Sequence, residues 1–307
     1  MTVGRWHAVA VFGVYLAFLA AFAGGCGAES PSTAGGAGVV ATTNYLADIV
    51  RNVAGDRMEV TALMPEGSDP HSFEPRPDDA RVIAESRLVV TDTVGLAPTV
   101  DALLEGAVQP GTMVLEAAKG LKGRQSEEGD EHAGETDPHF WLDPVNVLTY
   151  VANIRDTLAM LDPEGADAYR QNAESYSAQL RELDAWIVGE VAKIPANRRL
   201  LVTNHESLGY FTERYGFTLV GTVFNTLGAE GTPSAKQLAD LVDAIRASGV
   251  PAIFLESGSN AVLADEVARE AGVIVVTDLY VHSLGKNAPT YVDMIRWDVR
   301  RIVEVLE

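Results

Sequence analysis

Short apolar runs alternate with stretches of helical periodicity in the first part of the chain. Four runs have the length and β-branched content of buried strands: residues 39–41, 58–64, 88–90 and 112–115. The segments 44–53 and 78–86 between them show helical spacing of apolar residues. The runs are too short and too apolar for half-exposed antiparallel strands, so we expect a parallel sheet covered by helices on both faces.

A long amphipathic helix is predicted in the middle of the chain. Asp143 and Pro144 are suited to the N-cap and first turn of a helix that ends near residue 161. A second helix follows over residues 164–193. Its apolar residues recur every three or four positions as one buried stripe. They are Tyr169, Ala173, Tyr176, Leu180, Leu183, Ile187 and Val191.

The alternation of strands and helices begins again after residue 195. Strands are expected at 200–203, 218–223, 252–255 and 274–277, and helices at 206–215, 234–247, 260–271 and 289–306. The predicted fold class is α/β, with two lobes that each hold a parallel sheet flanked by helices. We assign residues 39–163 to an N-terminal lobe, 164–194 to a bridging helix and 195–307 to a C-terminal lobe.

The first 25 residues predict a secretory signal peptide. Arg5 is the only charged residue before Glu29, and residues 8–23 are apolar apart from one glycine. This run is short for a membrane-spanning helix. Cys26, the only cysteine, follows Ala-Gly-Gly in a pattern that resembles the lipobox of bacterial lipoproteins. We therefore expect a lipid anchor on Cys26 and a flexible tether over 26–38. A cleaved signal or an uncleaved anchor with an incidental cysteine stays an alternative.

The charge of the chain limits the classes of partner. It has 43 acidic and 23 basic residues and a formal net charge of -20. Such a surface repels nucleic acid and anionic lipid and raises the local concentration of cations. Because 47% of the residues are hydrophobic, the chain can bury a sizeable core.

The histidines are few, and their positions are informative. His7 lies in the signal peptide, and four of the other five occupy loops just after a strand or just before a helix: His71, His139, His205 and His282. Ligands of open α/β sheets bind beyond the carboxyl ends of the strands, so these side chains are expected to converge in the cleft between the lobes. Neutral imidazole is a common zinc ligand, and three or four of them suit tetrahedral coordination. The pattern predicts a transition-metal site, whereas any one of these residues alone would be read as an exposed loop histidine.

Four motifs in a fixed order relate the chain to a known family. They are GSDPHSFEP at 67–75, DPHFWLDP at 137–144, VTNHESLGYF at 202–211 and GTPS at 231–234. Over nearly the whole mature chain the sequence resembles the metal-specific solute-binding proteins of bacterial ABC importers, the zinc- and manganese-binding group. The resemblance implies two α/β lobes joined by a rigid long helix, with the metal in the cleft. It also implies an ABC-type permease and its ATPase as partners of a monomeric protein.

The resemblance assigns ligands by position. His71, His139 and His205 correspond to the first three ligands of the family. The third is commonly histidine in zinc-type members and glutamate in manganese-type members, so His205 favours Zn²⁺ over Mn²⁺. Where the family usually has an aspartate as the fourth ligand, this chain has His282. Asp278, four residues earlier, is the alternative fourth ligand.

An acidic segment separates the first two of these histidines. Zinc-type relatives often carry a loop rich in histidine and acids at this point. Here the segment is either a weak accessory collector of metal or a solvated charged loop. Its charged and imidazole side chains are Glu127, Glu128, Asp130, Glu131, His132 and Glu135.

The predicted function is extracytoplasmic capture of Zn²⁺ by a lipid-anchored protein and its delivery to a membrane importer. The chain has neither the His-Glu-x-x-His motif of metalloproteases nor the Gly-x-Ser-x-Gly turn of serine hydrolases. Four protein ligands would also leave no open position for catalysis, so we expect no enzymatic activity. A Mn²⁺ or Fe²⁺ carrier of the same fold, a zinc-dependent hydrolase and a surface adhesin are the alternatives.

Overall fold

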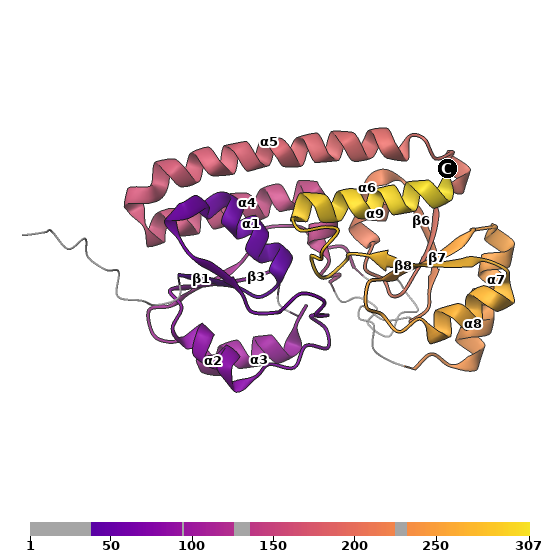
Figure 1. Cartoon of the computed structure of the whole chain (residues 1–307), viewed down its shortest axis with the longest axis horizontal. Coiled ribbons are helices and arrows are strands. Elements are labelled where there is room, and N and C mark those ends of the chain that lie inside the picture. The colour runs from indigo at the N-terminus through magenta and orange to yellow at the C-terminus, as the bar shows by residue number, and fades with distance from the viewer. Residues whose placement is uncertain (1–37, 94, 126–135, 225–231) are drawn as a thin grey trace, which may run out of the picture. The chain divides into compact units, whose positions relative to one another are not determined.

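The computed structural model describes residues 38–93, 95–125, 136–224 and 232–307 (Figure 1). The predicted signal peptide, Cys26 and residues 26–37 of the tether lie outside the described residues. The side chains expected to form the acidic loop lie outside them as well: Glu127, Glu128, Asp130, Glu131, His132 and Glu135. Among the helices that the structure describes, none is long and apolar enough to cross a membrane.

The N-terminal lobe contains a parallel sheet with the strand order β2-β1-β3-β4. Its strands are β1 (Val39–Ala41), β2 (Val60–Ala62), β3 (Leu88–Thr91) and β4 (Met113–Glu116). Successive residues of a strand point to opposite faces of the sheet. Val40 and Val89 accordingly pack with helices α2 (Pro77–Ala84) and α3 (Pro98–Ala107), whereas Val39 and Leu88 pack with α1 (Asn44–Ala54). Both faces are covered, which explains why every residue of β1 and β3 is buried.

The C-terminal lobe repeats this architecture with the strand order β6-β5-β7-β8, again parallel. Its strands are β5 (Leu200–Thr203), β6 (Thr218–Thr222), β7 (Ala252–Glu256) and β8 (Ile274–Leu279). Helices α7 (Ala235–Ser248) and α8 (Val262–Ala271) share one apolar cluster with Ile253 and Leu255. Helix α9 (Tyr291–Leu306) packs with Ala252 and Phe254 on the other face, on which α6 (Gly209–Tyr215) also contributes.

One long helix runs along both lobes (Figure 1). Helix α5 (Ala166–Val191) packs against α4 (Pro144–Leu161) and α1 of the N-terminal lobe and against α9 of the C-terminal lobe. All seven apolar residues of the predicted stripe are buried in α5, which confirms the bridging helix. They belong to a single apolar cluster that also contains Ala41 of one sheet and Phe254 of the other. The two sheets therefore share one continuous core.

Two elements differ most from the sequence expectation. Helix α3 was not predicted, because Gly95 and Pro98 mark its start as a turn and Gly106 weakens its helical pattern. Helix α6 begins at Gly209 instead of residue 206. The carbonyl of His205 accepts hydrogen bonds from the Thr203 hydroxyl (2.7 Å) and the Ser207 N–H (2.9 Å), so residues 205–208 form a turn before the helix.

Candidate metal centre

Four histidines from four separate loops meet at one point. His71 follows β2, His139 directly precedes the short 3₁₀ helix Phe140–Leu142, and His205 and His282 follow β5 and β8. The Nε2 atom of His139 lies 3.2 Å from those of His71 and His282 and 3.4 Å from that of His205. All four candidate ligand atoms lie within 4.8 Å of one another. The structure thus brings together the four histidines singled out in the sequence.

These distances match the coordination geometry of a zinc ion. Zinc–nitrogen bonds of about 2.0–2.1 Å in a regular tetrahedron give nitrogen–nitrogen edges of about 3.3 Å. The three separations from His139 Nε2, 3.2–3.4 Å, match those edges, and the remaining ligand atoms lie within 4.8 Å of one another. His139 and His205 are fully buried and His282 nearly so, whereas His71 is half-buried at the edge of the group.

A buried carboxylate orients His139. Asp137 Oδ1 accepts hydrogen bonds from the backbone N–H of His139 (2.9 Å) and from its Nδ1 (2.8 Å). Arg124 contacts the other carboxylate oxygen at 3.0 Å and also reaches Glu206 Oε1 at 2.7 Å, next to His205 in sequence. Burial raises the pKa of Asp137 to about 6, although the His139 N–H and Arg124 oppose that shift. Arg124 therefore connects residues beside two of the four histidines.

Glu256 orients two further histidines, and the sequence reading missed it. This last residue of β7 lies with Oε2 2.8 Å from His282 Nδ1 and with Oε1 2.9 Å from His205 Nδ1. The first contact is a well-formed hydrogen bond; the second is equally short, but its angle is outside good hydrogen-bond geometry. Burial raises the pKa of Glu256, but the two imidazoles outweigh it and hold the pKa well below its ordinary value. An acid at the carboxyl end of a buried strand, where the histidines also gather, was the available signal.

The hydrogen bonds at Nδ1 determine whether Nε2 of the same ring carries a lone pair or a hydrogen. A neutral imidazole that donates its Nδ1 hydrogen to a carboxylate has a lone pair on Nε2. The Nε2 atoms of His139 and His282 then present lone pairs to each other at 3.2 Å, an arrangement that a shared cation stabilises. Burial, reinforced by the neighbouring histidines, holds the pKa values of His71 and His139 well below the ordinary range, so both rings are neutral at pH 7.

Asp278, the alternative fourth ligand, lies away from this group. Strand β8 extends to Leu279, two residues beyond its predicted end, and the Asp278 carboxylate is directed toward α9. There it forms an ion pair with Arg301 at 3.0 Å, and its backbone carbonyl accepts a hydrogen bond from Trp297 Nε1 at 2.7 Å. Of the two candidates, the structure places only His282 with the other three histidines.

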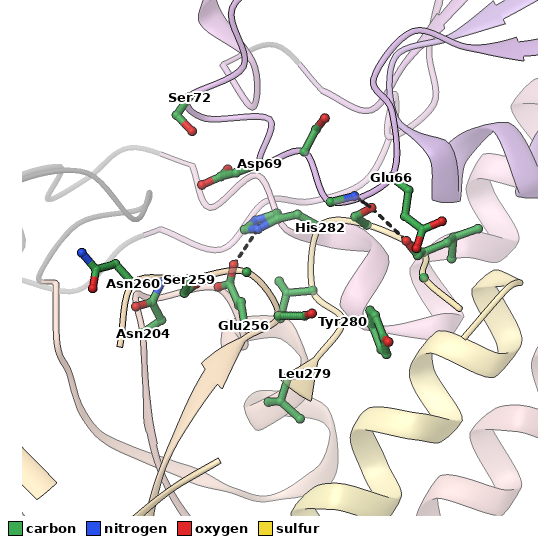
Figure 2. A pocket seen from close by; sticks show the side chains of 18 of the residues that line it. Glu66, Asp69, Ser72, Asn204, Glu256, Ser259, Asn260, Leu279, Tyr280 and His282 are labelled. Carbon is green, nitrogen blue, oxygen red and sulfur yellow. Dashed lines mark hydrogen bonds and ion pairs between the residues drawn. The ribbon is translucent and has the colours of Figure 1, made fainter. Parts of the chain in front are cut away.

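The loop that carries His282 is hydrogen-bonded to the N-terminal lobe. Trp141 Nε1 donates to the Val281 carbonyl (2.9 Å), and the Asn44 side chain accepts from the Leu284 N–H (2.8 Å) and donates to Ser283 Oγ (2.9 Å). A cavity of about 510 Å³ opens beside this loop and is lined by His282, Glu256 and Asp69 among others (Figure 2). One of the four histidines, His282, therefore lines a cavity with polar residues.

Known proteins resemble the chain in sequence over almost its full length. Residues 39–305 match the ZnuA family, described as "Zinc-uptake complex component A periplasmic". The "Manganese-binding lipoprotein MntA" of Halalkalibacterium halodurans is 34% identical over 301 residues, which cover 96% of this chain and 98% of that protein.

Solved structures show the same fold. The Mn-bound periplasmic metal binding protein from Candidatus Liberibacter asiaticus has a TM-score of 0.78 and 28% identity, with 88% of this chain and 99% of that chain covered. The periplasmic zinc binding protein TroA from Treponema pallidum has a TM-score of 0.81 and 25% identity, with 89% and 99% covered. The chain therefore belongs to the ZnuA family, the metal-binding, substrate-binding proteins of ABC importers.

Proposed function

We propose that the ion bound by this protein is Zn²⁺, held by His71, His139, His205 and His282 and delivered to an ABC-type permease with its ATPase. Membership of the ZnuA family makes the chain a periplasmic metal-binding component of an importer. It also confirms the expectation that the chain is not an enzyme. The metal is cargo, so the site has to hold the ion tightly and also release it.

The observation that carries the proposal is the convergence of four imidazoles, whose candidate ligand atoms lie within 4.8 Å of one another, with three Nε2–Nε2 distances of 3.2–3.4 Å from His139. Nitrogen donors suit zinc, whereas carboxylate and carbonyl oxygens suit manganese. Asp137 and Glu256 contact the far nitrogens of the rings, so their oxygens support the imidazoles as second-layer partners. A site of neutral nitrogen donors favours zinc.

Manganese is the second candidate for the bound ion, and iron is a related one. The name of a similar protein favours manganese. MntA of Halalkalibacterium halodurans, 34% identical to this chain, is named for manganese. Two buried carboxylates, Asp137 and Glu256, also lie directly behind the imidazoles and add negative charge close to a bound ion. Direct competition between the two metals separates the candidates.

The sequence supports capture at a membrane surface. Cys26 is proposed to carry a lipid that anchors the mature protein on the extracytoplasmic side, with the residues after it as a tether. The net charge of -20 draws cations toward the protein. In this proposal the metal enters through the cavity beside His282 and displaces protons from the imidazoles.

The test uses purified, metal-free residues 27–307 titrated with Zn²⁺ against a chelator of known affinity. Replacing any one of His71, His139, His205 or His282 with Ala should weaken zinc binding by more than about tenfold. Asp278→Ala is the matched control and should bind zinc as the unmodified protein does. An unaffected His282→Ala protein would contradict the ligand set. Displacement of zinc by an equal concentration of Mn²⁺ would instead favour the manganese carrier.

A further inference from the structure

Among the residues that the structure describes, Glu256 is the carboxylate with ion-pair contacts to two of the four histidines. Its Oε2 lies 2.8 Å from Nδ1 of His282, and its Oε1 lies 2.9 Å from Nδ1 of His205. These two imidazoles come from different loops of the C-terminal lobe, yet they lie parallel, with 5.3 Å between ring centroids and 8° between ring planes. Glu256 is itself buried, with 8% of its surface exposed. A single side chain thus holds half of the group.

We propose that Glu256 is the positioning residue that makes the centre selective for a nitrogen-preferring ion such as Zn²⁺, by holding His205 and His282 as Nδ1–H tautomers. The proposal rests on the proposed function. Each neutral tautomer directs an Nε2 lone pair toward the centre, so a neutral ring serves as a ligand without a change of tautomer.

The two-oxygen carboxylate is essential to this role. Glu256 Oε2 is hydrogen-bonded to His282 Nδ1, and Oε1 lies 2.9 Å from His205 Nδ1, a contact whose angle falls outside hydrogen-bond geometry. A carboxylate can accept at both oxygens. Glutamine in the same place has one acceptor oxygen and one amide NH₂ that only donates. One of the two rings would then face a donor at Nδ1 and would carry its hydrogen on Nε2. A ring protonated on Nε2 cannot bind the metal through that atom.

The negative charge of Glu256 is a second reason to expect that this residue affects which metal ion binds. Four neutral imidazoles leave the two positive charges of a bound ion uncompensated within the ligand set. Asp137 shares its charge with Arg124, whereas the ion-pair partners of Glu256 in the described part of the chain are His205 and His282. The compensating charge therefore lies one layer behind the ligands, where it strengthens the imidazoles as donors without putting oxygen on the metal.

The experiment compares Glu256→Gln with Asp137→Asn, which removes the same charge. Asp137 offers one oxygen, Oδ1, to His139, so asparagine can keep that acceptor and leave the His139 tautomer unchanged. The ring tautomers are determined by ¹⁵N NMR of the metal-free proteins labelled on histidine. Zinc affinity, zinc–manganese competition and the visible spectrum of bound Co²⁺ are then measured, with thermal unfolding as a check on the fold.

Glu256→Gln should convert one of His205 and His282 to the Nε2–H tautomer and weaken zinc binding by about 10–100-fold. It should also lower the zinc-to-manganese preference and change the tetrahedral Co²⁺ spectrum. Asp137→Asn should leave all tautomers unchanged and preserve more of the affinity. Unchanged tautomers in Glu256→Gln, or equal losses of affinity in the two variants, would overturn the proposal. If the unmodified protein failed to bind zinc, the proposed function itself would fail. The NMR result on the metal-free protein would still show whether Glu256 sets the tautomers of His205 and His282.

Discussion

The imidazoles of the metal centre differ in how readily they take up a proton. Burial and the neighbouring rings hold the pKa values of His71 and His139 well below 6.5. Burial also lowers the pKa of His282, but the charge and hydrogen bond of Glu256 outweigh it, so the net shift is upward from 6.5. Protonation during acidification therefore begins at His282, and the other two rings stay neutral to lower pH.

Zinc affinity should consequently fall as the pH is lowered from 8 to 5.5. Metal binding requires neutral imidazole, so below the pKa of His282, which lies above 6.5, each zinc ion displaces one proton. The apparent affinity then drops about tenfold per pH unit, and faster once further rings are protonated. Chelator competition at several pH values measures this slope. Equal affinity at pH 8 and pH 5.5 would contradict a histidine site.

Asp92, buried near the metal centre, makes a separate pH prediction for stability. Desolvation raises its pKa to about 7, although hydroxyls of Tyr45, Thr43 and Tyr150 lower it. The folded pKa of Asp92 lies above its unfolded value, so the contribution of Asp92 to stability is fully present at low pH and is lost as the pH rises from about 4 to 7. Asp92→Asn should therefore raise the free energy of unfolding of the metal-free protein at pH 8 by a few kcal/mol, on the order of 4. Urea unfolding at pH 4 is the control, where the gain should nearly vanish.

At the scale of elements, three of the four histidine loops follow the carboxyl ends of parallel strands, and contacts from the other lobe help to position them. The His282 loop shows this most clearly, because its backbone and Ser283 bond to Asn44 and Trp141. Asn44 is the first residue of α1, so a helix of one lobe holds the loop of a proposed ligand in the other.

Asn44→Ala should therefore weaken zinc binding without touching a ligand. It removes the hydrogen bond to the Leu284 N–H and the one to Ser283 Oγ, each contributing about 0.5–1.5 kcal/mol. A loss of about tenfold in zinc affinity is expected. Asn52→Ala on the same helix is the control, since Asn52 bonds only within the helix, to the Asp48 carbonyl. Equal zinc affinities of the Asn44→Ala and Asn52→Ala variants would show that the His282 loop keeps its position without Asn44.

Helix α5 allows a prediction about stability. Leu180 has 1% of its surface exposed in the shared core, whereas Val188 on the same helix is 55% exposed. Leu180→Ala should lower the free energy of unfolding by about 2–5 kcal/mol, and Val188→Ala should change it by no more than about 0.5 kcal/mol. Urea unfolding of the metal-free proteins measures both values. A small effect at Leu180 would mean that the stripe does not hold the two lobes together.

Much of this architecture could be predicted from the sequence, and the misses have physical reasons. Strands buried on both faces are continuous apolar runs, so their positions were found to within a few residues. The four histidines were singled out because they lie just after a strand or just before a helix, and strand ends mark the ligand edge of parallel sheets. Glu256 was missed because the last residue of an apolar strand looks like a strand end, and only the fold shows that it faces two imidazoles. The choice between His282 and Asp278 depended on two extra residues of β8, a boundary that sequence patterns do not resolve.

At the scale of the whole described unit, residues from Gly36 to Glu307 form one compact body. Helix α5 contacts α1 and α9, and the largest apolar cluster includes strands of both sheets. A rigid helix that packs on both lobes restricts their movement. We therefore expect metal binding to shift loops rather than to swing one lobe over the other.

Small-angle scattering of the metal-free and zinc-loaded protein tests this expectation. The radius of gyration should change by less than about 1 Å, because the shared core stays intact. Adding zinc to the His282→Ala protein provides the control for effects of the salt alone. A large compaction on adding zinc would instead indicate a wide closing motion about a flexible connection.

The shared core also determines whether the protein stays folded after it has released the metal ion. In small zinc-dependent domains the binding of the ion stabilises the folded state, and the chain is unfolded without the metal. Here the buried stripe of α5 and the sheets on either side of it form a core that does not depend on the ion. The metal-free protein should therefore stay folded and resistant to proteases, and it should be able to bind another metal ion.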